Sequence, residues 1–431
     1  MMVMVTHSLF NAGMARLDSP AVYLSAFAVA KGLAHLLKSP AVMSRQTVTA
    51  LVVDKKSYHK VGKFLIIITA SVVIMMSIIS FTGLARWIFR DIMGLKGRVL
   101  DEAITILQIL TVFPIAEIIR NIMQGLAIKH NVTYLTTIAT GARIIFVFIM
   151  VISIDKLSAL PGAVIAGLMF LGAVFIEAFV MFTGVRLITG KIQDGISRLS
   201  TKLPDADKNW GEKLSYKFII EFFYPLIITA IIKFICGPII NTGLGRTVNP
   251  EIAISAYAVG WSLGLIVTSP LLMYHQIPIY FLNNRRESYL EIKRFNIILG
   301  FLLSTIMACL AFTDLGYYIL TNWIGATNEI SLLAMDVLKV MTIIPLIRAF
   351  KEFYWGVLMK KHLTRYIGRG KIVGLMALII TVITMVIIDP ANPALIGIMA
   401  QLANMSAEAL YLYMIVVRKV NVYENLSSVN L

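Results

Sequence analysis

The stretch that decides the fold is "NAGMARLDSPAVYLSAFAVAKGL" at residues 11–33, because a second version, "NTGLGRTVNPEIAISAYAVGWSL", occupies residues 241–263. At a constant offset of 230, residues 10–46 and 240–276 share 13 identities in 37 columns. Apolar composition alone does not keep prolines, asparagines and glutamines in register, so the chain contains an internal repeat. The most telling identities are Asn11/Asn241, Pro20/Pro250, Pro40/Pro270 and Gln46/Gln276.

The repeat continues after one inserted residue, at an offset of 231. "FTGLARWI" at 81–88 matches "FTDLGYYI" at 312–319, and the proline-bearing segment 111–130 matches 342–361. The same offset would place the counterpart of residues 216–230 before Met1. We therefore expect the first helix to be shorter at its N-terminal end than the first helix of the second repeat.

Composition places this repeat in a membrane. The 431 residues are 58% hydrophobic and only 14% charged, with a mean hydropathy of +0.82. Soluble domains are about 45–50% apolar and roughly 25% charged. A spanning helix needs about 20 mostly apolar residues, which predicts an all-α polytopic membrane protein with two six-helix lobes. The twelve predicted spans are 1–16, 20–53, 62–89, 101–128, 132–154, 160–189, 215–244, 251–282, 296–324, 330–359, 372–389 and 393–417.

Basic residues predict the orientation. Of the Lys and Arg residues counted in the loops and the tail, 22 fall on one side of the predicted spans and 7 on the other. Basic residues stay on the cytoplasmic side, so both termini are expected in the cytoplasm, in the plasma membrane. This bias accounts for most of the net charge of +16 and argues against a nucleic-acid partner.

A hydrophilic linker at 191–213 divides the two predicted lobes, residues 1–190 and 214–431. Each lobe has an even number of spans, so both have the same orientation. Repeats of this kind are related by an axis along the membrane normal, with the substrate site between them near the midplane.

A stripe of basic side chains lies along the second predicted span. Lys31, His35, Lys38 and Arg45 fall within a sector about 80° wide at the helical spacing of about 100° per residue, and Gln46 lies near its edge. Charges at membrane depth cost several kcal/mol and usually face a cavity or a partner. The alternative for Arg45 is that its side chain reaches the headgroups.

The fourth and tenth spans carry further charges. Glu117, Arg120 and Gln124 share one helical face. The alternative to a cavity is an internal ion-pair network, with Glu117 bound to Arg348 or Arg120. Other side chains that can line a cavity or join such a network are Arg348, Lys351, Glu352 and Trp355, which share one face of the tenth span, the intramembrane acids Glu177, Glu221, Asp336 and Glu408, and Lys233.

The chain has no HExxH, GxSxG or Walker A pattern. Its six histidines are too scattered for a catalytic cluster, and its two cysteines lie in apolar runs. We therefore expect a protein that is not an enzyme and has no cofactor, with H⁺ or Na⁺ as the coupling ion if one is used. Without an ATP-binding domain, any active transport must be secondary or assisted.

The paired segments at 11–33 and 241–263, "KSPAVMSRQ" and "TSPLLMYHQ", and the two proline-bearing segments resemble the multidrug/oligosaccharidyl-lipid/polysaccharide (MOP) exporter superfamily over nearly the whole chain. "GPIINTGLGR" at 237–246 and "FTDLGYYIL" at 312–320 also resemble its progressive-ankylosis branch. The resemblance implies twelve helices in two lobes. The progressive-ankylosis branch is associated with export of anions such as pyrophosphate and citrate.

The multidrug (MATE) branch exchanges organic cations for protons or sodium, and some members use an acidic residue in the first helix. The matching helix here has Asn11 and no carboxylate. The nearest match to the acid that some sodium-coupled members use in the seventh helix is Glu221.

We therefore expect an exporter or flippase that works by alternating access on an anionic or pyrophosphate-bearing substrate. The alternatives are a MATE-type antiporter of organic cations and a non-transporting scaffold or scramblase of the cell envelope. The expected partners are the bilayer and a small-molecule or lipid-linked substrate, and the pattern is compatible with a monomer. The expected substrate-binding residues are Lys31, His35, Lys38, Arg45, Gln46, Asn11, Asn241, Lys233, His275, Gln276, Arg120, Arg348 and Lys351, and the coupling-ion candidates are Glu117, Glu221 and Glu352.

Overall fold

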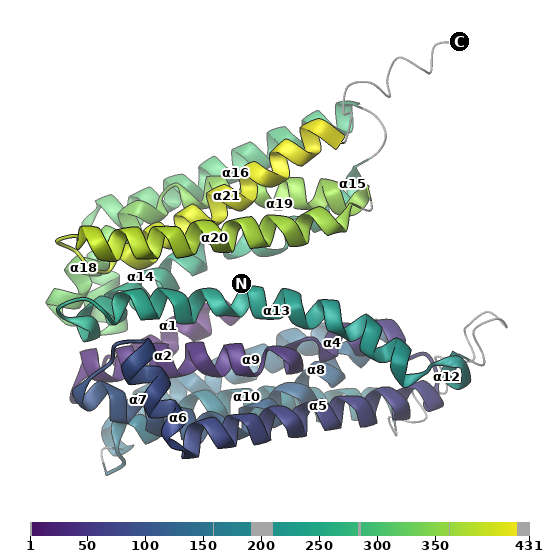
Figure 1. Cartoon of the computed structure of the whole chain (residues 1–431), viewed down its shortest axis with the longest axis horizontal. Coiled ribbons are helices and arrows are strands. Elements are labelled where there is room, and N and C mark those ends of the chain that lie inside the picture. The colour runs from purple at the N-terminus through teal and green to yellow at the C-terminus, as the bar shows by residue number, and fades with distance from the viewer. Residues whose placement is uncertain (1, 158, 191–209, 283–285, 362, 420–431) are drawn as a thin grey trace. The chain divides into compact units, whose positions relative to one another are not determined.

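The computed structural model describes the chain except residues 1, 158, 191–209, 283–285, 362 and 420–431. The regular elements of these described residues are helices, which confirms the predicted all-α class (Figure 1). Most of the predicted linker 191–213 falls outside the described part of the chain.

The helices of the first half are α1 (Met2–Met14), α2 (Pro20–Leu37), α3 (Ser39–Val42), α4 (Ser44–Leu51), α5 (Lys55–Phe81), α6 (Gly83–Trp87), α7 (Gly97–Ile109), α8 (Phe113–Lys129), α9 (Tyr134–Ile152) and α10 (Gly162–Thr189). Those of the second half are α12 (Trp210–Lys213), α13 (Tyr216–Leu244), α14 (Pro250–Thr268), α15 (Gln276–Phe281), α16 (Arg286–Phe312), α17 (Asp314–Tyr318), α18 (Asn328–Met341), α19 (Ile344–Lys360), α20 (Thr364–Ile388) and α21 (Leu395–Lys419).

Single helical turns of other types join several of these helices. They are the π-helices η1 (Ile88–Ile92) and η6 (Ile319–Ile324) and the 3₁₀ turns η2 (Leu110–Val112), η3 (Ile154–Leu157) and η5 (Ser269–Met273).

Ten helical segments within the described residues are long and apolar enough to cross a membrane. The pair α18 and α19, bent by 44°, makes an eleventh if it is one span. The chain is therefore an integral membrane protein, but the predicted count of twelve spans is not confirmed. The first predicted span contains only α1, a helix of 13 residues, and about 20 are needed to cross a bilayer.

The helix bounds confirm the internal repeat. A shift of 231 residues moves α5 onto α16, α6 onto α17 and α8 onto α19, with agreement at both ends of each helix. A shift of 230 moves the start of α2 onto that of α14. Two copies of one sequence pattern therefore fold into the same series of elements.

Even the turns are repeated. Thr82 before α6 and Thr313 before α17 each accept a hydrogen bond from the backbone N–H two residues ahead. The π-helices η1 and η6 follow at equivalent positions. Next come Gly94 and Gly325, with φ of 77° and 82°, a left-handed conformation that glycine adopts without the cost paid by other residues.

Contacts group the described chain into two compact units. We call residues 3–16 with 239–431 unit 1 and residues 17–238 unit 2. This grouping differs from the predicted lobes 1–190 and 214–431, because α1 belongs with the second half and most of α13 with the first. The division within α13 falls at Pro238.

Polar side chains explain the place of α1 in unit 1. The Asn11 amide nitrogen donates hydrogen bonds to the Ala258 carbonyl (3.1 Å) and to the Ser262 hydroxyl (2.8 Å), both on α14. The Arg16 guanidinium donates to the carbonyls of Trp323 (2.9 Å) and Ile324 (3.0 Å). The amide of Asn11 is buried and needs such partners, and together these bonds tie α1 and the turn after it to residues more than 240 positions away.

Apolar packing explains the place of α13 in unit 2. Ile219 and Phe223 are buried in a cluster with Val61 and Phe64 of α5. The rings of Phe64 and Phe223 meet edge to face with their centroids 5.2 Å apart. An aromatic pair of this kind adds about 0.5–1.5 kcal/mol beyond its area burial.

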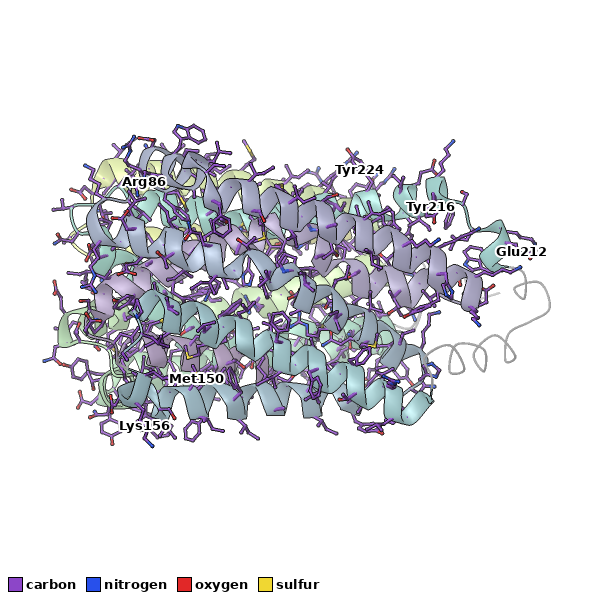
Figure 2. The ribbon with its side chains drawn as sticks, turned by 90° about the horizontal axis from the view of Figure 1, so that it is seen from below. Arg86, Met150, Lys156, Glu212, Tyr216 and Tyr224 are labelled. Carbon is purple, nitrogen blue, oxygen red and sulfur yellow. The ribbon has the colours of Figure 1, made fainter. Side chains whose placement is uncertain are left out.

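Asp54 fastens the short helix α12 to the start of α5. Its carboxylate accepts the backbone N–H of Ser57 (2.7 Å) and that of Gly211 (2.8 Å). Lys56 pairs with Glu212 beside this cap. Figure 2 shows Glu212 at one end of unit 2 and Arg86 and Lys156 at the opposite end, as expected for loops that alternate between two sides.

We predict that Asp54→Asn lowers the free energy of unfolding by about 1–2 kcal/mol at neutral pH, the usual range for loss of a cap. Burial acts to raise the pKa of Asp54, but the hydrogen bonds from Ser57 and Gly211 outweigh it and hold that pKa below its usual range. The stabilisation is therefore complete above about pH 4 and is lost as the pH falls further.

Thermal unfolding of the detergent-solubilised protein between pH 3 and pH 7 measures this effect. The exposed Asp155, which has no such cap, is the control, and Asp155→Asn should leave the curve unchanged. A difference between wild type and Asp54→Asn that grows as the solution is acidified would contradict the assignment.

Candidate functional site

The second predicted span is broken where its basic side chains lie. Helix α2 ends at Leu37, α3 starts at Ser39 with Pro40 in its first turn, and α4 starts at Ser44. Pro40 predicts a kink here, and the span predicted over 20–53 is interrupted at this point. Proline cannot donate a backbone hydrogen bond and is tolerated in the first turn of a helix, which accounts for the restart. As a result Lys31 and His35 lie on α2, Lys38 at the break and Arg45 on α4.

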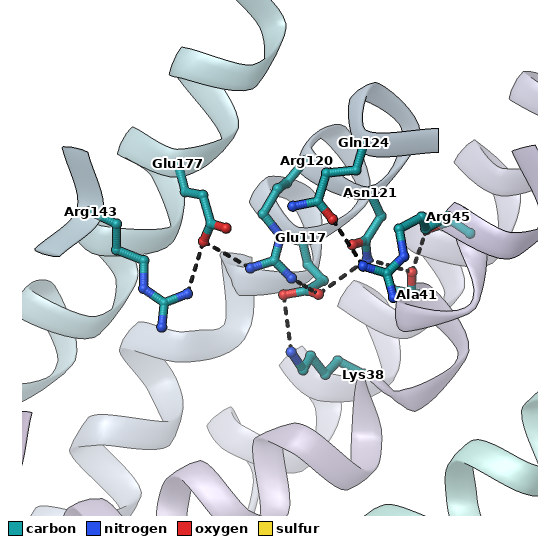
Figure 3. Close-up of polar contacts among 10 residues, drawn as sticks. Lys38, Ala41, Arg45, Glu117, Arg120, Asn121, Gln124, Arg143 and Glu177 are labelled. Atoms are coloured by element: carbon teal, nitrogen blue, oxygen red, sulfur yellow. Dashed lines mark hydrogen bonds and ion pairs between the residues drawn. The ribbon is translucent and has the colours of Figure 1, made fainter. Parts of the chain in front are cut away.

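Glu117 of α8 is the centre of an ion-pair network inside unit 2 (Figure 3). Its carboxylate accepts a hydrogen bond from the Lys38 ammonium at 3.0 Å and pairs with Arg120 one turn away. Asn121 donates to the same carboxylate at 3.1 Å and to the Ala41 carbonyl at 3.3 Å. The Glu117 side chain is only 2% exposed, so these bonds replace its hydration. The predicted pair of Glu117 with Arg120 is present.

Glu177 of α10 extends the network. One carboxylate oxygen lies 3.0 Å from the Arg120 guanidinium and 2.8 Å from that of Arg143 on α9. Arg120 therefore bridges two acids, and Glu177 bridges two arginines (Figure 3). Helices α8, α9 and α10 are linked by charges that are unfavourable in a membrane unless paired.

Two basic residues of the stripe have no acidic partner among the described residues. Arg45 donates a hydrogen bond to the neutral side chain of Gln124 at 3.4 Å. The Lys31 ammonium lies 4.8 Å from the centroid of the Phe27 ring, and the structure gives it no ion pair. Within unit 2, five basic side chains, namely Lys31, Lys38, Arg45, Arg120 and Arg143, thus accompany the carboxylates of Glu117 and Glu177, and three of the five form ion pairs with them.

Aromatic rings surround this cluster within unit 2. The Lys38 ammonium lies 4.2 Å from the centroid of Phe113. The His35 ring has the rings of Phe113, Phe170 and Phe234 within about 6 Å. Phe234 belongs to α13, and the Lys233 ammonium lies 5.4 Å from its centroid. Ring faces attract cations, so these side chains form an environment suited to positive charge without neutralising it.

Unit 1 contains a second network at equivalent positions. Glu352 of α19 lies 2.7 Å from the His275 ring nitrogen and 3.3 Å from the Lys351 ammonium. Glu408 of α21 lies 3.7 Å from Lys351 and 3.5 Å from Lys371 on α20. The His275 ring stacks on Trp355 at 4.7 Å.

The two networks use the same positions with different chemistry. Arg120 with Glu177 and Lys351 with Glu408 are ion pairs at positions related by 231 residues. By contrast, the pair Lys38–Glu117 corresponds to Thr268 and Arg348, where the guanidinium donates to a hydroxyl at 3.3 Å. The repeat therefore keeps one ion pair and replaces the other with a hydrogen bond from an arginine to a neutral hydroxyl group.

The other predicted site residues lie apart from these networks. Asn11 holds α1 against α14, and Asn241 is buried in unit 1. Glu221 on α13 is exposed. Gln46 and Gln276, which follow Arg45 and His275 along the chain, are also exposed.

Sequence reasoning missed Arg143 and Lys371 as members of the networks. Both lie on helices whose other residues are mostly apolar. A signal was present in the sequence, since Glu177 and Glu408 are related by the repeat offset of 231. Two buried acids at equivalent positions each require basic partners.

The chain matches known proteins in sequence and in fold. The model of the progressive ankylosis protein (ANKH) family matches residues 2–254 and 207–428. An inward-facing MATE multidrug-resistance transporter of the MOP superfamily is 14% identical with a TM-score of 0.72, over 98% of this chain and 95% of that one. The lipid II flippase MurJ, in an inward closed conformation, is 13% identical with a TM-score of 0.65, over 96% and 86%. A MOP superfamily transporter from Pyrococcus furiosus, described as having a binding pocket of reverse polarity, is 13% identical with a TM-score of 0.55, over 98% and 94%.

We predict that Glu177→Gln destabilises the protein by about 3–5 kcal/mol, the cost of breaking a buried ion pair, because it removes the only acid bound to Arg143 among the described residues. Adding Arg143→Met should restore part of the loss, because Arg120 retains Glu117. Melting temperatures of the two single variants and the double variant provide the test. A double variant whose loss equals the sum of the two single losses would show that the network is not coupled.

Proposed function

Because this chain belongs to the progressive ankylosis protein family and has the fold of a membrane transporter or flippase, we propose that it carries an anionic solute across the membrane. In this proposal transport proceeds by alternating access, with both termini in the cytoplasm and the plasma membrane as its location. The substrate is a compact anion or one that bears a pyrophosphate group.

The observation that carries the proposal is the excess of basic charge in unit 2. The carboxylates of Glu117 and Glu177 form ion pairs with three basic side chains, Lys38, Arg120 and Arg143, while Lys31 and Arg45 form none with the described residues. Each uncompensated charge at membrane depth costs several kcal/mol. A bound anion removes that cost, so it stabilises the same arrangement that recognises it.

Lys31 and Arg45 are the residues we assign to substrate binding. They lie on either side of the Lys38–Glu117 pair along the chain, and neither has an acidic partner among the described residues. A guanidinium binds the oxygens of a carboxylate or phosphate in bidentate fashion. The rings of Phe27, Phe113 and Phe170 limit the water that competes for these cations.

The paired acids have a different role in this proposal. Glu117 and Glu177 orient Lys38 and Arg120, and Glu352 orients Lys351 and His275. Glu117 and Glu352 must release a basic partner before they bind a coupling ion. Glu221, which is exposed, does not face this competition and is our first candidate if H⁺ or Na⁺ is coupled.

A cationic substrate fits this charge distribution poorly. An organic cation placed beside Lys31 and Arg45 meets like charges, and a low local dielectric strengthens that repulsion. A site of opposite polarity has precedent in this fold, since the Pyrococcus furiosus transporter is described as having a binding pocket of reverse polarity.

We predict that Lys31→Ala and Arg45→Gln each weaken anion binding about tenfold or more, since a hydrogen bond to a charged group contributes about 1.5–3 kcal/mol. Neither substitution removes an ion-pair partner of the buried Glu117 or Glu177. The measurement is the thermal shift of the detergent-purified protein with pyrophosphate, citrate and nucleotides, followed by uptake of the best ligand into proteoliposomes.

The control for this experiment is Lys96→Ala, which removes a basic charge from an exposed loop position. It should leave both binding and uptake unchanged. Stabilisation by lipophilic cations such as tetraphenylphosphonium, unaffected by Lys31→Ala, would overturn the proposal and favour an exchanger of organic cations. Absence of stabilisation by all of these anions would also count against it.

A further inference from the structure

A groove of about 520 Å³ lies on unit 1 between α16, α19 and α21, apart from the ion-pair networks. Its wall includes Phe350, Tyr354, Leu410 and Tyr413. The side chains of Leu410 and Tyr413 are 61% and 45% exposed, so the groove is open. Its apolar walls suit a hydrocarbon chain.

Three of the four polar residues that line the groove lie toward one end of these helices, and the fourth, Ser406, lies at the middle of α21. Lys293 is about two turns from the start of α16, and Tyr354 and Tyr413 are about two turns from the ends of α19 and α21. The rings of Tyr289 and Phe353, 5.3 Å apart, show that the start of α16 lies beside the end of α19. Phe350 and Leu410, which lie nearer the middle of their helices, are apolar. The groove is therefore amphipathic along its length.

Lys293 makes no hydrogen bond or ion pair with the residues that the structure describes, although it lines the groove. A lysine on a spanning helix extends its apolar stem along the surface and places its ammonium among the headgroups. Anionic lipid headgroups attract such cations. The charge at this end of the groove thus matches a phosphate attached to acyl chains.

The repeat provides an internal comparison. At the equivalent positions of unit 2, every polar residue of the groove is replaced by one with no charge or hydroxyl group. The pairs are Lys293/Gly62, Tyr354/Met123, Ser406/Phe175 and Tyr413/Phe182. Packing of the helix bundle therefore does not require these polar groups, since the other copy of the same bundle lacks them.

We propose that this groove of unit 1 binds one anionic phospholipid from the bilayer. Its acyl chain lies along Phe350 and Leu410, and its phosphate accepts hydrogen bonds from Lys293 and the tyrosine hydroxyls. The site involves none of the residues assigned above to transport, so its test does not depend on the transport proposal.

Native mass spectrometry of the full chain in detergent tests this site, with phosphatidylglycerol and phosphatidylcholine of identical acyl chains as probes. We expect one phosphatidylglycerol molecule to bind more tightly than phosphatidylcholine. Lys293→Ala should weaken phosphatidylglycerol about fivefold, the typical effect of one basic residue near an anionic surface, and leave phosphatidylcholine unchanged. Ser406→Phe, which copies the equivalent residue of unit 2, should weaken both lipids by filling the groove.

The matched control is Lys63→Ala, which removes an exposed lysine at a similar depth of α5, the counterpart of α16. It should leave the affinity for both lipids unchanged. Equal weakening by Lys63→Ala and Lys293→Ala would show a general effect of surface charge and overturn the proposal. The comparison of these two lysine variants decides the matter even if Ser406→Phe does not fold.

Discussion

A charged side chain inside a membrane protein is costly unless a partner offsets its charge, and the ion-pair networks of both units follow from this constraint. Glu117 and Glu177 hold α8, α9, α10 and the break after α2 together through Lys38, Arg120 and Arg143. Replacing one acid leaves a charge that neither lipid nor packing compensates. Ion pairs between the helices therefore add directional contacts to packing that otherwise depends on the shapes of apolar side chains.

The internal repeat provides two versions of this solution, and their difference is chemical. The bond from Lys38 to Glu117 becomes a bond from Arg348 to Thr268, which changes an ion pair into a cation with a neutral partner. A duplicated fold can thus keep its helices and turns while the two copies carry different charged side chains at equivalent positions. The groove on α16, α19 and α21 follows the same rule, since its polar residues occur in one copy.

Much of the fold was predictable from the sequence because membrane helices and repeats leave strong signals. Long apolar runs gave the all-α class, and prolines in register gave the offset of 231 that the helix bounds confirm. Pro40 indicated a kink in the second span, but not the two breaks at Lys38 and Met43, since both residues keep helix-like backbone angles that periodicity does not distinguish. Arg143 was missed because a single charge in an apolar helix shows no pattern until its partner Glu177 is placed beside it. The assignment of α1 to the second half depended on single hydrogen bonds that no sequence pattern encodes.

The place of α1 has a consequence for synthesis of the chain. Unit 2 is one continuous stretch, so all of its residues are synthesised before those of α14. Asn11 cannot form its hydrogen bond to Ser262 until that residue, 251 positions later in the chain, has been made. Chains fold as they are made, with the N-terminal part first, so until then water, headgroups or the insertion machinery must satisfy the amide of Asn11 and the guanidinium of Arg16. Helix α1 is thus made well before its final partners exist.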